Sequence, residues 1–225
     1  MITITIISDN VCPHCLLARN RLNRALEIFR KTVPGGSTTP ISIHWQAHLL
    51  QLTSPQASYI PSSGSTSASS ITEAKFGAER ARAKQEKLAR AGAAEGINFS
   101  FTGKIGPTRD SHRLVALGKT KGWEVADALV VAIMKMYFEG GGDITSFDDL
   151  VGAAQRAGID ANEAREWLES GKGDTEVDEE VKKSIAMNIT GVPTIIINDK
   201  YTVDGAEDMF GFLEALSKAK DDVSA

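Results

Sequence analysis

The segment Ile6-Ile7-Ser8-Asp9-Asn10-Val11-Cys12-Pro13-His14-Cys15 decides the fold of this chain, because it joins a strand pattern to a helix pattern. Before it, residues 2–7 alternate isoleucine with threonine and then run apolar, which predicts a buried β-strand. After it, apolar residues recur at helical spacing until Pro34 and two glycines end the pattern. Residues 41–45 alternate again, so the start of the chain predicts a β-α-β unit with a right-handed crossover.

The two cysteines of the chain form one C-x-x-C pair at the predicted start of the helix. The first turn of a helix has unpaired N–H groups and a partial positive charge, which stabilise a thiolate at Cys12 and make it the expected nucleophile. Cys15 follows one turn later, within reach of a disulfide, and is expected to be the more covered of the two. Pro13 suits a first helical turn, and His14 adds a donor or a positive charge near the thiolate. The motif therefore predicts thiol–disulfide exchange.

Two other interpretations of the cysteine pair are open. A structural zinc site needs four ligands, but the chain has no second C-x-x-C, and His44, His48 and His112 lack the paired spacing of a zinc finger. The cysteines could instead be small apolar residues of the core. Their position between a strand and a helix favours redox chemistry over both interpretations, and no metal is expected.

The middle of the chain predicts helices after a polar loop. Residues 53–70 hold eight serines and no charged residue, which predicts a flexible loop. Residues 71–188 then carry helical patterns separated by glycines, with Ser146, Asp160 and Asp174 as the expected helix caps. No strand signal is found there, so this part is expected to be all helical.

Strand patterns return near the end of the chain. Residues 194–197 and 201–203 are rich in β-branched and aromatic residues around a turn, and they predict a β-hairpin before a final amphipathic helix. Neither end of the chain makes a full sheet alone. We therefore expect an α/β protein in which both ends form one four-stranded sheet and the helical block is inserted between them.

Composition narrows the classes of partner. The chain has 225 residues and a formal net charge of −4, which gives no electrostatic footprint for nucleic acid or an anionic membrane. No apolar run approaches the roughly 20 residues that cross a bilayer, and the chain opens without a basic, signal-like segment. A cytoplasmic location is expected. Residues 75–90 are rich in Lys and Arg, and we interpret them first as a solvated amphipathic helix, with an anion-binding surface as the alternative.

The sequence resembles the DsbA-like thiol-disulfide oxidoreductases, and within them the cytosolic FrnE-like branch, over nearly the whole chain. The resemblance rests on residues 8–15, the Asp110-Ser111-His112-Arg113-Leu114 stretch, residues 137–144, and Gly191-Val192-Pro193-Thr194 leading to residues 201–206. It implies a thioredoxin-like fold (β-α-β then β-β-α) interrupted by an all-α inserted domain. The implied boundaries are 1–52 and 189–225 for the thioredoxin-like domain, 53–70 for a flexible loop, and 71–188 for the helical insertion.

The resemblance also implies roles for single residues. Pro193 is similar to the cis-proline that faces the active-site cysteines in this family, so the bond from Val192 to Pro193 is expected to be cis and to lie beside Cys12. The backbone before it would bind a substrate polypeptide as an added strand. His112 is expected to line the groove between the two domains. A related branch, the kappa-class glutathione transferases and chromene-carboxylate isomerases, carries Ser where this chain has Cys12, which argues against a transferase.

These observations predict an enzyme, a cytosolic thiol–disulfide oxidoreductase with Cys12 and Cys15 as catalytic residues and Pro13, His14, Val192 and Pro193 as supporting ones. No metal or organic cofactor is expected. The expected partners are thiols and disulfides of proteins or peptides, with glutathione as a further candidate co-substrate. The alternatives are a non-catalytic polypeptide- or ligand-binding protein of the same fold, and a glutathione-dependent enzyme of the kappa-like branch.

Overall fold

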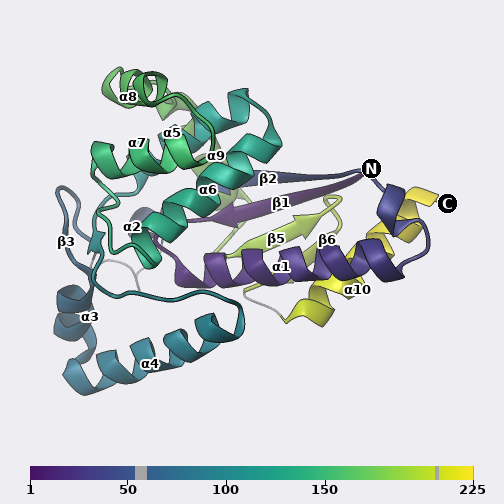
Figure 1. Cartoon of the computed structure of the whole chain (residues 1–225), viewed down its shortest axis with the longest axis horizontal. Helices are drawn as coiled ribbons and strands as arrows, with labels where there is room; N and C mark the ends of the chain where they lie inside the picture. Colours follow the sequence, from purple (N-terminus) through teal and green to yellow (C-terminus); the bar gives the residue numbers. More distant parts are fainter. Residues whose placement is uncertain (54–59, 206–207, 225) are drawn as a thin grey trace.

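A four-stranded sheet lies at the centre of the protein, in the order β2-β1-β5-β6 (Figure 1). The structure is a computed structural model, and it describes residues 1–53, 60–205 and 208–224. The four strands come from the two ends of the chain, as the sequence predicts, and they are β1 (Ile2–Ser8), β2 (Ile41–Ala47), β5 (Thr194–Ile197) and β6 (Tyr201–Asp204).

Strand β1 is central because both of its edges are paired. It runs parallel to β2, with Ile2 opposite Ile41, and antiparallel to β5, with Ile4 opposite Ile197. Its isoleucines at positions 2, 4 and 6 are fully buried, whereas the intervening threonines are half-buried. The alternation in the sequence therefore separates a covered face of the sheet from a more open one.

The hairpin between β5 and β6 turns through residues with positive φ. Asn198 and Asp199 have φ of 52° and 54°, and the Lys200 N–H donates to the Ile197 carbonyl at 3.1 Å. Positive φ at both central residues is the geometry whose twist fits a two-stranded ribbon, and Asn and Asp adopt it more readily than most residues. The predicted hairpin is confirmed.

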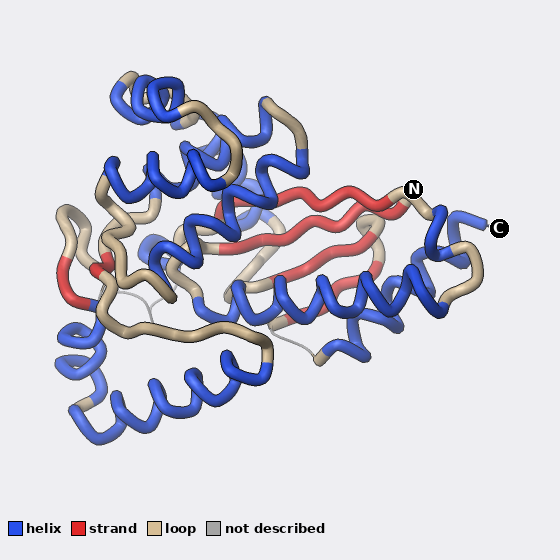
Figure 2. Tube along the Cα trace, in the orientation of Figure 1, coloured by secondary structure: helices blue, strands red, loops and turns tan. Residues whose placement is uncertain are grey.

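Two long helices run beside the sheet (Figure 2). Helix α1 (Pro13–Thr32) follows β1, and α10 (Met209–Ser224) closes the chain and packs against α1. The apolar residues that define the α1 pattern in the sequence are the ones that it buries, among them Leu22 and Phe29. Phe212 of α10 is fully buried in the same cluster. These helices bury the isoleucine face of β1.

Between β2 and β5 the chain forms the inserted region. Its elements are mostly helices, and Figure 1 shows them gathered at one end of the sheet. The short turn η1 (Gly36–Thr38) precedes β2 and lies outside this region. In chain order, the described elements between β2 and β5 are α2 (Leu50–Thr53), β3 (Thr66–Ser67), α3 (Ala68–Phe76), α4 (Ala78–Ala94), β4 (Lys104–Ile105), α5 (Arg109–Thr120), α6 (Trp123–Phe138), α7 (Phe147–Arg156), α8 (Ala161–Glu169) and α9 (Asp174–Ala186).

The inserted region also contains two short strands, so the prediction that it is all helical needs correction. β3 and β4 pair antiparallel, with Thr66 opposite Ile105. Strands of two residues are too short for a period of two to show in the sequence. β3 lies in the serine-rich segment, directly before α3, which begins at Ala68 with Ser67 as its cap, whereas β4 follows α4. Residues 54–59 of that segment lie outside the described residues, and the predicted mobility of residues 53–70 stays a prediction.

Two of the three predicted helix caps are confirmed. Ser146 accepts a hydrogen bond from the Asp149 N–H, and Asp160 accepts from the N–H groups of the two helical residues that follow its neighbour. Asp174 is instead the first residue inside α9, and Gly173, with φ of 86°, precedes it. The carboxylate of Asp174 accepts a hydrogen bond from Arg109 Nε at 2.6 Å, which explains why it does not cap its own helix.

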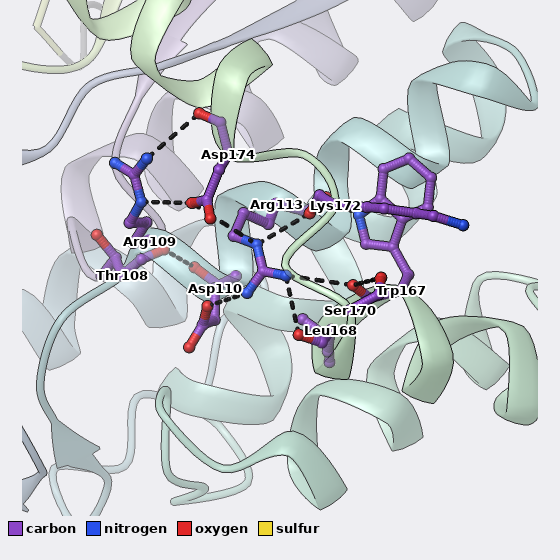
Figure 3. A network of polar contacts seen from close by, with 10 residues as sticks. Thr108, Arg109, Asp110, Arg113, Trp167, Leu168, Ser170, Lys172 and Asp174 are labelled. Carbon is purple, nitrogen blue, oxygen red and sulfur yellow. Dashed lines mark hydrogen bonds and ion pairs between the residues drawn. The ribbon is translucent and has the colours of Figure 1, made fainter.

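A buried arginine fixes α5 against the end of α8 (Figure 3). Arg113 is only 5% exposed, and its guanidinium donates to the carbonyl groups of Trp167, Leu168 and Lys172 at 3.2, 2.8 and 2.9 Å. A helix ends with carbonyl groups that have no partner within the helix, and a cation there also meets the negative end of the helix dipole. Asp110 balances the charge. The network positions α5, which carries residues of the site described below.

The sheet and the inserted helices share one apolar cluster. It runs from the isoleucines of β1 and residues of α1 to Leu114 of α5 and Leu129 and Ile133 of α6. The two parts are therefore packed together and not joined by a linker alone. None of the helices in the described residues is long and apolar enough to cross a membrane.

Candidate active site

The chain turns sharply between β1 and α1, and this turn places Cys12 at the helix N-terminus. The Cys12 N–H donates to the Asp9 carbonyl, and the Cys15 N–H donates to the Cys12 carbonyl, both at 3.0 Å. Cys12 is the N-cap residue, Pro13 opens the helix, and no side chain caps the free N–H groups. The first turn also contains no acidic residue. An anion at Cys12 therefore meets the positive end of the α1 dipole without competition from a carboxylate in that turn.

The two thiols lie in contact and have different surroundings. Both are free, Cys12 is 6% exposed, and Cys15 is completely buried, which is the order that the motif predicts. Burial raises the pKa of the Cys15 thiol well above its ordinary value, and its hydrogen bond to Cys12 raises the pKa further, against smaller opposing effects of Ser8 and the Asp9 backbone. Cys15 therefore keeps its proton and can donate it toward the sulfur of Cys12.

The segment before β5 lies beside Cys12. The Val192–Pro193 peptide bond is cis, and the Cys12 thiol donates to the Val192 carbonyl over 3.4 Å. Both parts of the prediction for this proline are confirmed. The sheet explains the contact, because β1 ends where the antiparallel strand β5 begins, with Ile7 opposite Thr194.

His14 is exposed, and of the two roles expected for it, hydrogen-bond donor or positive charge, the second is disfavoured by its surroundings. Partial desolvation lowers the pKa of His14 from its ordinary value of 6.5, and the positive charges of Arg21, Lys87 and Lys84 lower this pKa further. The imidazole is thus neutral at pH 7 and keeps only its role as a hydrogen-bonding group. The positive charge near the motif comes from α1 and α4 instead.

A layer of buried polar residues lies directly behind the motif, and sequence reasoning did not assign it to the site. The Asn10 amide donates to the Ser111 hydroxyl at 2.8 Å, which joins the turn after β1 to α5. The Asp9 carboxylate accepts from the Leu50 N–H at 2.8 Å, and His48 contacts Ser184 of α9 at 3.0 Å. The five residues that make these contacts are at most 1% exposed, namely Asp9, Asn10, His48, Ser111 and Ser184. The signal in the sequence was the run of polar residues directly after a buried strand.

His112 belongs to this layer. It lies at the junction of the sheet and the inserted helices and is 6% exposed, and its expected place in a groove between the domains stays a prediction. Its Nε2 lies 3.6 Å from an Asp9 carboxylate oxygen and has no hydrogen-bond partner among the described residues. Burial lowers the pKa of His48. The negative charge of Asp9 opposes this shift, and the charge of His112 adds to it.

The remaining histidines do not assemble a metal site. In the ranges 1–53, 60–205 and 208–224, no group of three or more His, Cys, Asp or Glu side chains is placed to hold a metal ion. Of the predicted site residues, the structure brings together Cys12, Cys15, Pro13 and Val192 with Pro193, and it places His14 at the surface beside them.

Comparisons with known proteins identify the family and the fold. Residues 3–217 match the family described as DSBA-like thioredoxin domain. A search of curated proteins found no match. Among solved structures, a probable DsbA oxidoreductase from Streptomyces coelicolor is 27% identical, has a TM-score of 0.81, and is matched over 98% of this chain and 91% of that one.

Two further solved structures share the fold at lower identity. A putative protein disulfide isomerase from Nitrosomonas europaea is 14% identical, with a TM-score of 0.70 and 98% of each chain covered. The cytosolic disulfide reductase DsbM from Pseudomonas aeruginosa is 11% identical, with a TM-score of 0.64, and the match covers 97% of this chain and 99% of that one. Since the family match spans almost the entire sequence, this chain belongs to the DSBA-like thioredoxin domain family.

Proposed function

We propose that this chain is a thiol–disulfide oxidoreductase that exchanges disulfides with protein or peptide substrates through Cys12 and Cys15. One observation carries the proposal, namely the unequal pair of thiols in contact at the start of α1, with Cys15 fully buried behind Cys12. Exchange needs an accessible thiolate that attacks first and a second thiol that attacks later, within bonding range of the same sulfur.

The reaction follows from this arrangement. The Cys12 thiolate attacks a substrate disulfide, so that a bond forms between Cys12 and one substrate sulfur while the second substrate sulfur leaves and takes a proton from solvent. Cys15 then loses its proton and attacks the Cys12 sulfur, which releases the first substrate sulfur as a thiol. The substrate gains two electrons, and the enzyme ends as the Cys12–Cys15 disulfide. The same steps in reverse oxidise a substrate dithiol.

The position of the Val192 carbonyl indicates where the main chain of a substrate peptide would bind. It lies 3.4 Å from the Cys12 sulfur, and an extended peptide beside it can donate an N–H to this carbonyl while its sulfur reaches Cys12. No metal or organic cofactor enters the proposed steps, and glutathione is a candidate thiol that would return the enzyme disulfide to the dithiol. We also propose a cytoplasmic location, where thiols are kept reduced, because both cysteines belong to the exchange site.

Turnover of insulin tests the proposal. The wild-type protein should catalyse reduction of insulin by dithiothreitol at substoichiometric concentration, and Cys12→Ser should abolish this catalysis. Cys15→Ser should perform the first attack and accumulate mixed disulfides at Cys12, visible as mass adducts with glutathione or insulin chains.

The opposite results would refute it. Protection of insulin from aggregation without turnover, equally in the wild type and Cys12→Ser, would favour a binding protein. Adducts that form at Cys15 in preference to Cys12 would reverse the assigned roles.

A further inference from the structure

An apolar pocket of about 160 Å³ lies beside the C-x-x-C segment. Its walls come from the active-site turn, from α3 and α4, from the segment around β4, and from the end of α6. Its apolar lining includes Val11, Pro13, Leu88, Phe101, Tyr137 and Phe138. Two of these residues, Val11 and Pro13, flank Cys12 in the sequence, so the pocket lies against the turn that carries the reacting cysteine.

The aromatic walls are held in place by ring contacts. The rings of Tyr137 and Phe138 meet edge to face with centroids 4.7 Å apart, and Phe138 meets Phe99 in the same manner at 5.5 Å. A rigid apolar cavity of about 150 Å³ is large enough to bind a benzene ring. The pocket volume therefore matches one aromatic ring or one branched aliphatic side chain.

The side of the pocket formed by α4 is positively charged. α4 carries five Lys or Arg residues and two Glu residues, although the whole chain has a net charge of −4. Lys84 lines the pocket and is exposed, and its Nζ lies 4.7 Å from the centre of the Phe76 ring. Lys87 lies close enough to the motif to act on His14 together with Lys84. Among the described residues, no carboxylate forms an ion pair with either lysine.

We propose that this pocket receives one aromatic or branched aliphatic side chain adjacent to the reacting cysteine of a substrate peptide, and that Lys84 and Lys87 favour an acidic residue beside that cysteine. This inference rests on the proposed function and names its substrate class. Glutathione offers carboxylates but no apolar group of this size, so it leaves the pocket empty. The residues that select the substrate side chains are then mainly those of α3 and α4, and none of these residues takes part in the exchange of disulfides.

Four peptide disulfides test the inference on the wild-type protein. Each is a symmetric dimer of a short peptide with a central cysteine, preceded by phenylalanine or alanine and followed by glutamate or glutamine. Each oxidises the reduced protein to the Cys12–Cys15 disulfide and leaves as two peptide thiols, so the rate of thiol loss is measured by alkylation and mass spectrometry. We expect the phenylalanine peptides to react at least about tenfold faster than the alanine peptides. Glutamate should add about threefold, and this gain should shrink at high salt.

Three variants connect these preferences to the pocket. Gln85→Phe fills the pocket from α4 with an apolar ring and should reduce the preference for phenylalanine to within about twofold. Lys84→Gln should remove most of the preference for glutamate and its dependence on salt. Arg82→Gln is the matched control, because it makes the same change of charge on α4 at a position that does not line the pocket, and it should keep both preferences.

The outcomes separate this inference from the proposed function. If all four peptides oxidise the protein at equal rates, exchange stands and the pocket does not select substrates. A preference for phenylalanine that survives Gln85→Phe would also overturn the inference. If no peptide oxidises the protein and insulin is not turned over, the proposed function itself fails. The four peptides give this answer with the wild-type protein even where a variant fails to fold.

Discussion

Replacing Arg113 with methionine should destabilise the protein strongly, because this buried side chain is the donor for three backbone carbonyls at once. Its guanidinium donates to the carbonyls of Trp167, Leu168 and Lys172 and pairs with Asp110. Methionine fills much of the same volume but donates nothing, so two carbonyls near the end of α8 and one just after it lose their donor. A buried acceptor left without its donor costs about 1–3 kcal/mol. The Leu168 hydrogen bond is buried and the other two are part-buried, so we count about 1–3 kcal/mol for the first and about 1 kcal/mol for each of the others. Asp110 is 37% exposed, so water can solvate its carboxylate once the arginine is gone.

We therefore expect Arg113→Met to lower the free energy of unfolding by about 3–5 kcal/mol, from the three carbonyls together. For a chain of this size, such a loss lowers the melting temperature by roughly 6–20 °C. Urea and thermal denaturation of the reduced protein measure both quantities. Arg109→Met is the matched control, since Arg109 lies on the same helix but pairs with partly exposed carboxylates, and its loss should cost at most about 1 kcal/mol. The reasoning is refuted if the two variants melt at the same temperature.

Three further predictions follow from buried groups. Iodoacetamide should label Cys12 in the reduced protein and spare Cys15, because burial raises the pKa of the Cys15 thiol, and equal labelling by peptide mapping would contradict this. Burial lowers the pKa of His48, so the unfolded chain binds more protons below pH 6.5 and the free energy of unfolding should fall from about pH 7 to 5. His48→Asn should flatten that slope in urea titrations, and an unchanged slope would show that another group causes it. Asp127 accepts hydrogen bonds from the Trp45 indole and from an arginine of α1, so Asp127→Ala should cost about 3 kcal/mol and change tryptophan fluorescence, whereas Asp127→Asn, which keeps an acceptor, should lose less.

The sheet and the reactive pair could be predicted from the sequence because their signals are local. The alternation of Ile and Thr in β1 identifies a strand, and the C-x-x-C directly after it identifies the turn into a helix. In the same way, Asn198 and Asp199 identify the turn of the hairpin, because both residue types adopt positive φ readily. Each of these signals covers a few neighbouring residues, and tertiary contacts only reinforce it.

The polar layer and the charge on His14 could not be predicted, because both depend on residues distant in the sequence. Asn10 meets Ser111 across 101 positions, and no pattern around either residue indicates the other. His14 is kept neutral in part by lysines of α4, which only the fold brings near. The sequence around Asp174 predicts a helix cap, but its carboxylate accepts a hydrogen bond from Arg109 of another helix, which the local pattern does not reveal.

The separation of Cys12 and Val192 along the chain has a consequence for synthesis of the protein. The two residues are 180 positions apart, and β1 lacks its β5 neighbour until the last part of the chain has been made. At about 5–20 residues per second, a ribosome needs roughly 10–40 s to cover that distance. During this interval the strand that completes the surroundings of both thiols is still missing. A newly made chain is therefore open to oxidants and to other thiols before it can act on any substrate.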